Sequence, residues 1–498
     1  MILSKRSIDK IVANNRGEYN TTAGVLPVKV IQFGTGVLLR GLPDYVIDKA
    51  NKQGIFNGKI VVVKSTEQGT TDSFKKQDCL YTLVIKGLKN GKLIEETTIC
   101  EAIANTLSAN TQWDQVLLES HNPELKLVIS NTTEVGLQLV NEKITMTPPN
   151  SYPGKLLAFL YERFNFFNSD TNFGLIVIPT ELLPGNGDIL KDIILKLAAF
   201  NSLNSQFIEW LTSCVHFCNS LVDRIVPGKL SGPEQLAFES AHGYQDDLLI
   251  TAEPYLLWAI EGNDHVRDVL SFASADPGVV ISNDITVFRE LKLRLLNGTH
   301  TLLCGLSVLS LFDTVKAAFA NEEYKLYAAK LMSEIAESIP CKIESGQVNS
   351  FIADVIERFQ NPFIEHLWLN ICVQYTSKLK TRVLPLLMEH YRKSNQVPPH
   401  IAIGFAFYIV YMRSEKKDDG FYCISRGTPY KIADVYAEAL YLSWKETSSH
   451  EIAGKVLMDT TIWDTDLGNL PGFVTAVQHY INIIVEAGSR EMLFKALI

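Results

Sequence analysis

Short apolar runs alternate with longer stretches of helical periodicity over the first 286 residues. The runs are rich in Val, Ile and Leu, which is typical of strands in a parallel sheet that helices cover on both faces. The expected strands are residues 28–33, 59–63, 125–130, 175–179, 214–218 and 279–282. This pattern predicts an α/β fold with a Rossmann-type, doubly wound parallel sheet.

From Arg289 onward the strand pattern stops, and apolar residues recur at helical spacing. The expected helices are residues 303–312, 324–339, 351–359, 364–378 and 433–444. The charged run at residues 413–420 is expected to be a solvated connection between elements. We therefore predict two domains, one with the sheet over residues 1–286 and a mainly α-helical one over residues 287–498.

A glycine turn follows the first expected strand directly. The turn is Gly34-Thr35-Gly36, and a helix is expected from Val37 to Lys49 with a kink or restart at Pro43. This order is typical of a dinucleotide-binding fold, because the first glycine permits a tight turn and the second lets the backbone approach the pyrophosphate. Leu39 stands where the usual third glycine would be, so a turn that binds no ligand remains the alternative.

The main candidate for chemistry is the segment from Lys292 to His300, which also contains Asn297. At about 100° of rotation per helical residue, the three side chains would fall within an arc of roughly 140°. A lysine whose pKa is lowered can act as a general acid or base, and an Asn N–H can hold a developing oxyanion. The set favours proton transfer to an alcohol or ketone without a metal.

Each of these residues also has an ordinary structural explanation. A lysine is most often a solvated surface residue, and a histidine near Leu302 and Leu303 is most often part of a core. Asn297-Gly298 is a helix-boundary signal, and a distorted helix there would change the expected arc. Cys214-Val215-His216-Phe217-Cys218 suggests metal ligands, but alternation on a buried strand explains it better, and we expect no metal site.

Composition narrows the class of protein. The chain has 498 residues, of which 46% are hydrophobic, and this is enough for two large cores. The net charge of −9 and the lack of a basic run argue against nucleic-acid or anionic-lipid partners. The eight cysteines are scattered and no secretory leader is evident, while the longest apolar runs are well short of the roughly 20 residues of a membrane span. We expect a cytoplasmic protein with free thiols.

Three motifs together resemble the mannitol dehydrogenase family of polyol-specific long-chain dehydrogenases. They are Gly34-x-Gly36-x-x-x-Arg40, Asn219-Ser220-Leu221-Val222-Asp223-Arg224 and Lys292-x-Arg294-x-x-Asn297-x-x-His300. The resemblance continues through residues 130–136, 151–156 and 358–362 and covers most of the chain, to about Pro385. These segments are most similar to the family's tagaturonate/altronate branch, which acts in galacturonate breakdown. Residues 180–187 lack the Asp-Asn pair that is usual in the polyol enzymes.

The resemblance implies roles for the matching residues. Lys292 would be the general acid/base, Asn219 and Asn297 the oxyanion donors, and His300 would orient a substrate hydroxyl. Asp223-Arg224 would be either a structural ion pair or a direct substrate contact. The residues expected to bind the cofactor are Ile31, Gln32, Phe33, Gly34, Thr35, Gly36, Val37, Leu38, Glu67 and Asn131.

Cofactor choice depends on the end of the second strand. Lys64 favours NADP and Glu67 favours NAD, because a basic residue suits the ribose phosphate and an acidic one the free hydroxyls. The resemblance implies NAD.

The substrate is expected to be a small sugar acid, whose carboxylate needs a cationic partner. Arg294, Lys378 and Arg382 are the candidates, since guanidinium meets carboxylate in bidentate fashion and the last two share a helix face. A solvated helix end is the alternative for Lys378 and Arg382. Three functions stay open: tagaturonate/altronate oxidoreductase, a fructuronate/mannonate or mannitol-type enzyme, and a catalytically silent nucleotide-binding protein. The intact Lys292, Asn297 and His300 argue against the third.

Overall fold

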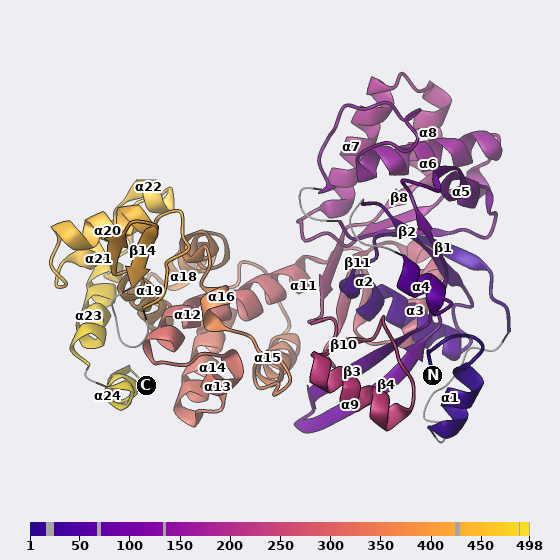
Figure 1. The fold of residues 1–498 in the computed structure, drawn as a ribbon. Coiled ribbons are helices and arrows are strands. Elements are labelled where there is room, and N and C mark those ends of the chain that lie inside the picture. The colour runs from indigo at the N-terminus through magenta and orange to yellow at the C-terminus, as the bar shows by residue number, and fades with distance from the viewer. Residues whose placement is uncertain (16–23, 67–70, 133–135, 424–428, 488, 498) are drawn as a thin grey trace. The chain divides into compact units, whose positions relative to one another are not determined.

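The computed structural model describes residues 1–15, 24–66, 71–132, 136–423, 429–487 and 489–497 (Figure 1). The chain divides into two compact units. The first comprises Met1–Gly87 and Leu93–Ile285, and the second comprises Leu88–Lys92 and Thr286–Ile498. No helix among the described residues is long and apolar enough to cross a bilayer.

A six-stranded parallel sheet forms the centre of the first unit. Its strand order is β5-β2-β1-β6-β7-β8. The bounds are β1 Val28–Phe33, β2 Lys59–Lys64, β5 Ile103–Ser108, β6 Leu127–Ser130, β7 Ile176–Pro179 and β8 His216–Phe217. Because the order runs outward from β1 on one side and from β6 on the other, this is the doubly wound Rossmann topology, and the predicted fold class is confirmed.

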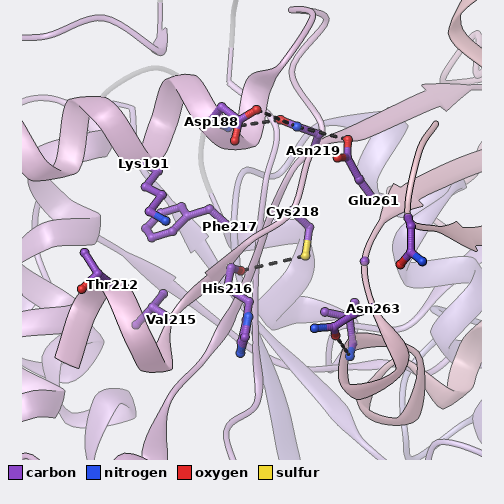
Figure 2. Close-up of a pocket in the computed structure, with 13 residues that line it drawn as sticks. Asp188, Lys191, Thr212, Val215, His216, Phe217, Cys218, Asn219, Glu261 and Asn263 are labelled. Atoms are coloured by element: carbon purple, nitrogen blue, oxygen red, sulfur yellow. Dashed lines mark hydrogen bonds between the residues drawn. The ribbon is translucent and has the colours of Figure 1, made fainter. Parts of the chain in front are cut away.

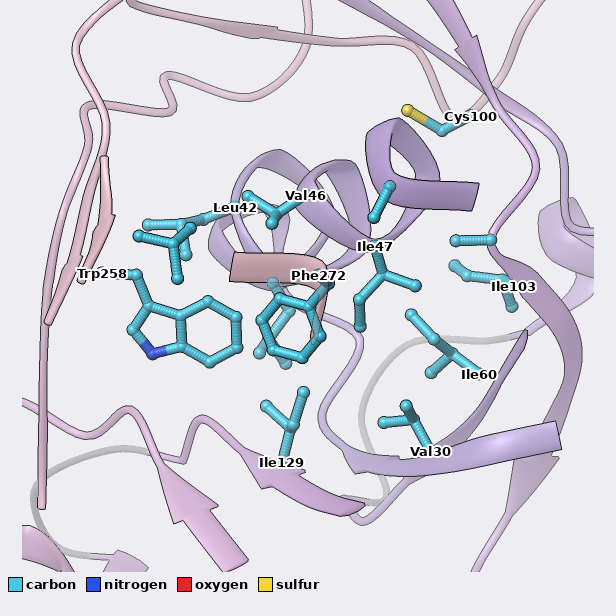
Figure 3. Packing of buried hydrophobic residues seen from close by; sticks show 14 of the residues in the cluster. Val30, Leu42, Val46, Ile47, Ile60, Cys100, Ile103, Ile129, Trp258 and Phe272 are labelled. Carbon is cyan, nitrogen blue, oxygen red and sulfur yellow. The ribbon is translucent and has the colours of Figure 1, made fainter. Parts of the chain in front are cut away.

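Both faces of this sheet are covered, which explains the continuous apolar runs. Val30 and Ile60 face one core, whereas Ile31 and Val61 face the other. Figure 3 shows the first of these cores, with Val46 and Ile47 of α3 near the strand residues. The helices of this unit are α1 Ile8–Asn14, α2 Val37–Gly41, α3 Pro43–Lys52, α4 Asp72–Lys76, α5 Trp113–Leu118, α6 Tyr152–Phe166, α7 Asn186–Phe200, α8 Ser205–Cys214, α9 Gly232–His242 and α10 Asp264–Val269.

Two smaller sheets complete the first unit. One has the order β10-β3-β4, with β10 Ile250–Ala252, β3 Tyr81–Lys89 and β4 Lys92–Cys100. The other has the order β12-β11-β9, with β12 Val279–Ser282, β11 Leu257–Glu261 and β9 Ser220–Asp223. The strand predicted at residues 279–282 therefore exists but lies outside the main sheet, and β5 replaces it there.

The predicted helix from Val37 to Lys49 is confirmed as two pieces, α2 and α3. The break is at Leu42, whose φ and ψ are −133° and −81°. Pro43 then begins α3, because proline lacks an N–H but has a helical φ, which suits the first helical position.

The second unit is mainly helical, as predicted. Its elements up to the middle of the unit are α11 Thr286–Glu290, η5 Leu291–Gly298, α12 Thr299–Leu309, α13 Val315–Phe319, α14 Glu322–Glu337, α15 Ser345–Phe359, α16 Trp368–Ile371, α17 Tyr375–Lys378, η6 Leu379–Val383 and α18 Leu384–Ser394. The remaining helices are α19 Pro399–Tyr411, α20 Ala437–Glu446, α21 Ile452–Leu457, α22 Thr460–Trp463, α23 Phe473–Glu486 and α24 Arg490–Leu497. η5 and η6 are π-helical turns.

Helices α12 and α19 cross at very short range in the core of this unit. A Cβ on Gly305 would lie 2.7 Å from the Phe407 carbonyl oxygen, and one on Gly404 would lie 2.4 Å from the Leu302 side chain. The long apolar run of α19 is buried on every side, from Ile401 to Tyr411. It is therefore a core helix of this unit rather than a surface element.

Two predictions for the second unit were wrong in detail. The helix expected at residues 364–378 is broken into α16 and α17, with Gln374 in the left-handed region at φ +54°. The charged run at 413–420 is not a mere connection: Ser414–Lys417 forms β13, which pairs with β14, Gly420–Cys423, as an exposed hairpin. The residues of β13 are polar or charged, and the apolar Phe421, Tyr422 and Cys423 of β14 lie just beyond the charged run, so the run itself has no strand pattern.

Candidate active site

Gly34 makes the turn after β1 and occupies a conformation that requires glycine. Its φ is +135°, and its N–H donates to the Val63 carbonyl at 3.0 Å. A Cβ there would lie 2.7 Å from Leu39 Cδ1 and 3.1 Å from the Asn131 carbonyl oxygen. Since Asn131 follows β6, Gly34 lets the ends of β1 and β6 approach each other at the point where the strand order diverges.

Gly36 has a different reason to be glycine. Its φ and ψ, −63° and 156°, suit any residue, and no atom of the described residues lies within 4 Å of a Cβ built there. The fold therefore does not need this glycine, whereas a phosphate in front of the turn would need the space. Thr35, Val37 and Leu38 are half-buried beside it. Ile31, Gln32 and Phe33 are fully buried in β1 and support the turn from below.

The remaining predicted cofactor residues lie at neighbouring strand ends. Asn131 donates from Nδ2 to the Thr180 carbonyl and hydroxyl oxygens, both at 3.0 Å, and so links the ends of β6 and β7. The side chain of Lys64 is buried, and its ammonium donates to the Thr66 carbonyl. Glu67 lies outside the described residues.

Arg40, the arginine of the glycine motif, is a structural residue. Its guanidinium donates to the Leu248 carbonyl and lies over the rings of Phe74 and Tyr81, at 5.7 and 5.5 Å. Burial lowers its pKa. It therefore anchors α2 to the core instead of meeting a ligand.

Arg224 has a similar structural use. Its Nε donates to the Glu253 carbonyl at 3.0 Å and its Nη1 to the Gly41 carbonyl at 2.6 Å. The guanidinium also lies 4.8 Å from the centre of the Tyr45 ring. These contacts tie β9 to the end of α2, so Arg224 stabilises the glycine turn through α2.

Asn219 follows β8 and lines a polar cavity of about 310 Å³ in the first unit (Figure 2). Its Nδ2 donates to Asp188 Oδ2 at 2.9 Å and to Glu261 Oε2 at 3.2 Å. Its Oδ1 accepts from the backbone N–H groups of Gly187 and Asp188, at 3.0 and 3.1 Å. Both donors of the amide are thus taken in this structure, so an oxyanion role for Asn219 would require the release of Asp188 or Glu261.

The same cavity contains His216 and Cys218 of the Cys-Val-His-Phe-Cys run. The Cys218 thiol is directed toward the His216 carbonyl at 4.0 Å, and burial raises its pKa to about 12. Burial and the nearby His265 lower the pKa of His216. Within the described ranges, no three His, Cys, Asp or Glu side chains are arranged to hold a metal ion.

In the second unit, the Lys292 to His300 segment is not one regular α-helix. Leu291–Gly298 is the π-helical turn η5, and α12 begins at Thr299. A π turn has about 4.4 residues per turn, so five residues bring Asn297 to within roughly 50° of Lys292 around the axis. The expected arc of about 140° between them, which assumed an α-helix, is therefore wrong, and the two residues are better aligned than predicted.

Among the described residues, the side-chain amide of Asn297 and the Nε2 of His300 have no hydrogen-bond partner. Within the described part of the chain the Asn297 side-chain amide makes no hydrogen bond, and Asn297 is half-buried, as is Lys292. His300 is only 7% exposed, its Nε2 has no hydrogen-bond partner, and its ring stacks on Phe359 at 4.1 Å. These are the groups that a substrate oxygen could satisfy.

Basic residues surround His300. Burial lowers the pKa of His300 well below its usual value, and His366, Arg358, Arg382 and Lys378 lower it further, so the imidazole is neutral near pH 7. Burial and Arg382 also lower the pKa of Lys378.

Two of these four residues, His366 and Arg358, were not predicted. Arg358 carried the only signal, because it begins a segment shared with the family. His366 lies 5.2 Å from His300, ring to ring, and has no motif around it.

The three candidate carboxylate ligands differ in their freedom. Lys378 Nζ donates to the Ile371 carbonyl at 2.7 Å, and Arg382 Nη1 to Thr301 Oγ1 at 3.2 Å, and both side chains keep further donors and partial exposure. Arg294 is 6% exposed, with Nε on Glu290 Oε2 at 2.9 Å and Nη1 on the Thr381 and Arg382 carbonyls, both at 2.8 Å. Arg294 is therefore engaged within the protein and is not carried forward as a carboxylate ligand.

Comparison with known proteins agrees with this division of the chain. Residues 28–272 match the mannitol dehydrogenase Rossmann domain, and residues 284–485 match the mannitol dehydrogenase C-terminal domain. The chain belongs to the mannitol dehydrogenase family. The second matched region begins at residue 284, next to Ile285, where the first compact unit ends.

Three relatives that match almost the full chain are altronate oxidoreductases. The altronate oxidoreductase of Halalkalibacterium halodurans is 34% identical over 99% of this chain and 97% of its own length. Those of Shigella flexneri and Bacillus subtilis are each 33% identical, over 93% and 94% of this chain and 96% and 95% of their own.

Two solved structures have the same fold over the whole chain. One is a Pseudomonas fluorescens mannitol 2-dehydrogenase in ternary complex with NAD and D-mannitol, with a TM-score of 0.69 at 20% identity, covering 100% of this chain and 99% of that one. The other is a substrate-free D-sorbitol dehydrogenase, with a TM-score of 0.79 at 20% identity and complete coverage of both chains.

Proposed function

We propose that this protein is an NAD-dependent oxidoreductase that interconverts D-tagaturonate and D-altronate by hydride transfer without a metal. The observation that carries the proposal is the set of unpaired polar groups in the second unit, surrounded by basic side chains. The net charge of the chain is −9, yet three cationic side chains lie around the neutral His300: Lys378, Arg382 and Arg358. His366 lies beside them, and burial lowers its pKa. Such a local excess of cations suits an anionic sugar better than a neutral one. The altronate oxidoreductase relatives support the same substrate class.

The glycine turn fits a dinucleotide. Gly36 leaves open space in front of a backbone that needs no glycine, and Gly34 lets β1 and β6 close up beneath it. Lys64 is buried against Thr66, which leaves it poorly placed for a ribose phosphate and favours NAD over NADP. NAD bound at this turn would supply the hydride in one direction and accept it in the other.

The side chains of the second unit would manage the proton and the oxygen. In ketone reduction Lys292 gives a proton to the carbonyl oxygen, and in the reverse direction it takes the proton from the hydroxyl. The unpaired Asn297 N–H donates to the same oxygen and stabilises its charge in the transition state. The neutral His300, through its unpaired Nε2, holds a neighbouring substrate hydroxyl.

The substrate carboxylate is assigned first to Arg382 and then to Lys378, because both keep donors that are not used within the described structure. A charged hydrogen bond of this kind contributes about 1.5–3 kcal/mol. Tagaturonate should therefore have a kcat/KM at least about tenfold above that of the neutral ketose of matching stereochemistry.

The decisive experiment measures kcat/KM with NADH for tagaturonate, fructuronate and the matching neutral ketoses. Arg382→Gln should abolish most of the preference for the acid over the neutral sugar. Lys380→Gln is the matched control, because Lys380 is on the same turn but pairs with Asp464 at 2.6 Å, and it should keep the preference. A parent enzyme that reduces fructose as well as tagaturonate would refute the uronate assignment, and a preference for fructuronate would move it to the mannonate reaction.

A further inference from the structure

Two π-helical turns lie against each other in the second unit. η5 joins α11 to α12, and η6 joins α17 to α18. The two turns approach closely at Gly298, where a Cβ would lie 3.8 Å from Leu386 Cδ1 and 3.9 Å from the Arg382 carbonyl oxygen. Turns of this kind are rare and usually have a local cause.

For η6 the cause is Pro385 in the first turn of α18. Proline has no N–H, so it cannot donate to the Thr381 carbonyl four residues earlier. Arg294 from η5 supplies the missing donor, because its Nη1 lies 2.8 Å from both the Thr381 and the Arg382 carbonyl oxygens. Its Nε is paired with Glu290 at 2.9 Å, which compensates the buried charge.

A second link runs in the opposite direction. Arg382 in η6 donates from Nη1 to Thr301 Oγ1 at 3.2 Å, and that hydroxyl donates to the Asn297 carbonyl of η5 at 2.7 Å. Thr301 is fully buried. Each π turn therefore sends an arginine to the backbone of the other, directly from Arg294 and through a hydroxyl from Arg382. We call these four residues, Glu290, Arg294, Thr301 and Arg382, the arginine clasp.

The clasp acts on the backbone that carries the candidate chemistry. With about 4.4 residues per π turn, Lys292 and Asn297 in η5 are offset by roughly 50° around the helix axis, whereas an α-helix would separate them by about 140°. The Thr301 hydroxyl donates to the Asn297 carbonyl of η5, and Arg294 of η5 donates to two backbone carbonyls of η6.

We propose that Arg294 and Thr301 are positioning residues, which hold η5 in the register that directs Lys292 and Asn297 to the same substrate oxygen. This inference rests on the proposed function only in taking those two residues as the proton donor and the oxyanion donor. It also gives Arg294, which has no freedom to bind substrate, a use in the reaction.

The test compares Thr301→Val with Thr301→Ser. Val keeps the shape but removes the hydroxyl, whereas Ser keeps the hydroxyl. A displacement of about 1 Å at a reacting group can cost on the order of a hundredfold, so Thr301→Val should lose at least about tenfold in kcat. The KM for NADH should change less than about twofold, since the glycine turn is untouched. Thr301→Ser should recover kcat to within about threefold.

Two further measurements separate positioning from loss of structure. With NADH deuterated at the transferred position, Thr301→Val should show a larger isotope effect on kcat, because hydride and proton transfer become slower than product release. Amide hydrogen exchange over residues 291–302 should be faster in Thr301→Val than in Thr301→Ser, with no change in the first unit.

A second variant guards against a Thr301→Val protein that does not fold. Arg294→Lys offers a single ammonium where the guanidinium meets one carboxylate and two carbonyls, and it should lower kcat with the same isotope effect. Wild-type kcat and isotope effect in both variants would overturn the proposal. So would equal losses in Thr301→Val and Thr301→Ser, or a kcat loss that is matched by lost NADH affinity and a lower Tm.

The outcome is distinguishable from a failure of the substrate assignment. The Thr301 and Arg294 variants should lower kcat for the acid and the neutral sugar by the same factor, which leaves the preference between them unchanged. If the parent enzyme does not turn over tagaturonate, the substrate assignment fails, and the clasp is tested with whichever ketose it reduces.

Discussion

Asn219 in the first unit and Asn297 in the second carry the same residue type in two shared motifs, yet the protein treats them in opposite ways. The Asn219 side chain donates to Asp188 and Glu261, and its oxygen accepts from two backbone N–H groups. The Asn297 side chain has no hydrogen bond among the residues described, and only its carbonyl is used, by Thr301. One amide is part of the framework, and the other is left for a ligand.

The contrast extends to the two units. Around the glycine turn the fold offers empty space and backbone, while the nearby side chains of Arg40, Asn131 and Arg224 are bound within the protein. Around η5 and α12 the fold offers side-chain groups that it has not satisfied, such as His300 Nε2. Buried polar groups normally find partners, so the unsatisfied ones indicate where a substrate completes the structure.

The largest effect is expected at Lys292. A general acid contributes about 10²–10⁴ to the rate, so Lys292→Ala should lose that factor in kcat while NADH still binds, as followed by fluorescence. Lys330→Ala, at an exposed position on α14, is the control and should be silent. Near-normal turnover in Lys292→Ala would remove this lysine from the mechanism and with it the chemical role of η5.

The two asparagines provide the next test. Asn297→Ala should lower kcat by about 10²–10³, the usual cost of removing an oxyanion donor, with little change in Tm. Asn219→Ala should lower kcat far less but destabilise the first unit by about 1–3 kcal/mol, because Asp188 and Glu261 lose their shared donor. Equal losses of kcat in the two variants would return Asn219 to the list of oxyanion donors.

Much of the fold was predictable because its strands are buried on both faces. Val28–Phe33 is mostly apolar and Lys59–Lys64 contains four consecutive apolar residues, and the glycine turn after the first strand indicates the order of a dinucleotide-binding fold. The edge strand β5 was missed, since Asn105 and Thr106 interrupt its apolar pattern. Pro43 was informative because its effect is local.

The candidate site was predictable by residue but not by geometry. The π turn of η5 depends on contacts between Arg294 and carbonyls 87 and 88 positions away, which no local pattern encodes. The partners of Asn219 are likewise distant, with Glu261 42 residues further along the chain. His366 became visible only when the fold placed its ring beside His300.

The two glycines of the turn also differ in role: Gly34 is required by the fold, whereas Gly36 leaves space for a ligand. Gly36→Val should raise the KM for NADH at least about tenfold with little change in Tm, since a side chain there meets no protein atom but would occupy the phosphate space. Gly34→Ala should instead lower stability by about 1–3 kcal/mol, because φ is +135° and the new Cβ would meet Leu39. Steady-state kinetics and thermal unfolding of both variants measure the split. A Gly36→Val protein whose KM rises equally for NADH and the sugar acid would contradict phosphate binding at this turn.

The smallest effect concerns a buried carboxyl beneath this turn. Burial raises the pKa of Asp44 to about 8, although a bond from Gln32 Nε2 at 3.3 Å and the nearby Arg40 lower it in part. The unfolded value is about 3.9, so the folded state binds this proton more tightly. The stability it contributes is complete below about pH 4 and is lost as pH rises toward about 8.

Asp44→Asn removes this titration while keeping the shape of the neutral acid. The Tm of the variant should match the parent near pH 4 and exceed it by several degrees near pH 8, at about 2–4 °C per kcal/mol for a unit of this size. Asp48→Asn, one turn further along α3, is the opposing control: Asp48 pairs with Lys52 at 2.7 Å and accepts from the Glu101 N–H at 2.6 Å, so its loss should lower Tm at both pH values. The difference between parent and Asp44→Asn isolates this carboxyl from every other titrating group. A parent and variant with parallel Tm profiles from pH 4 to 8 would show that Asp44 is ionised in the folded state, and that the polar groups buried beneath the turn are satisfied after all.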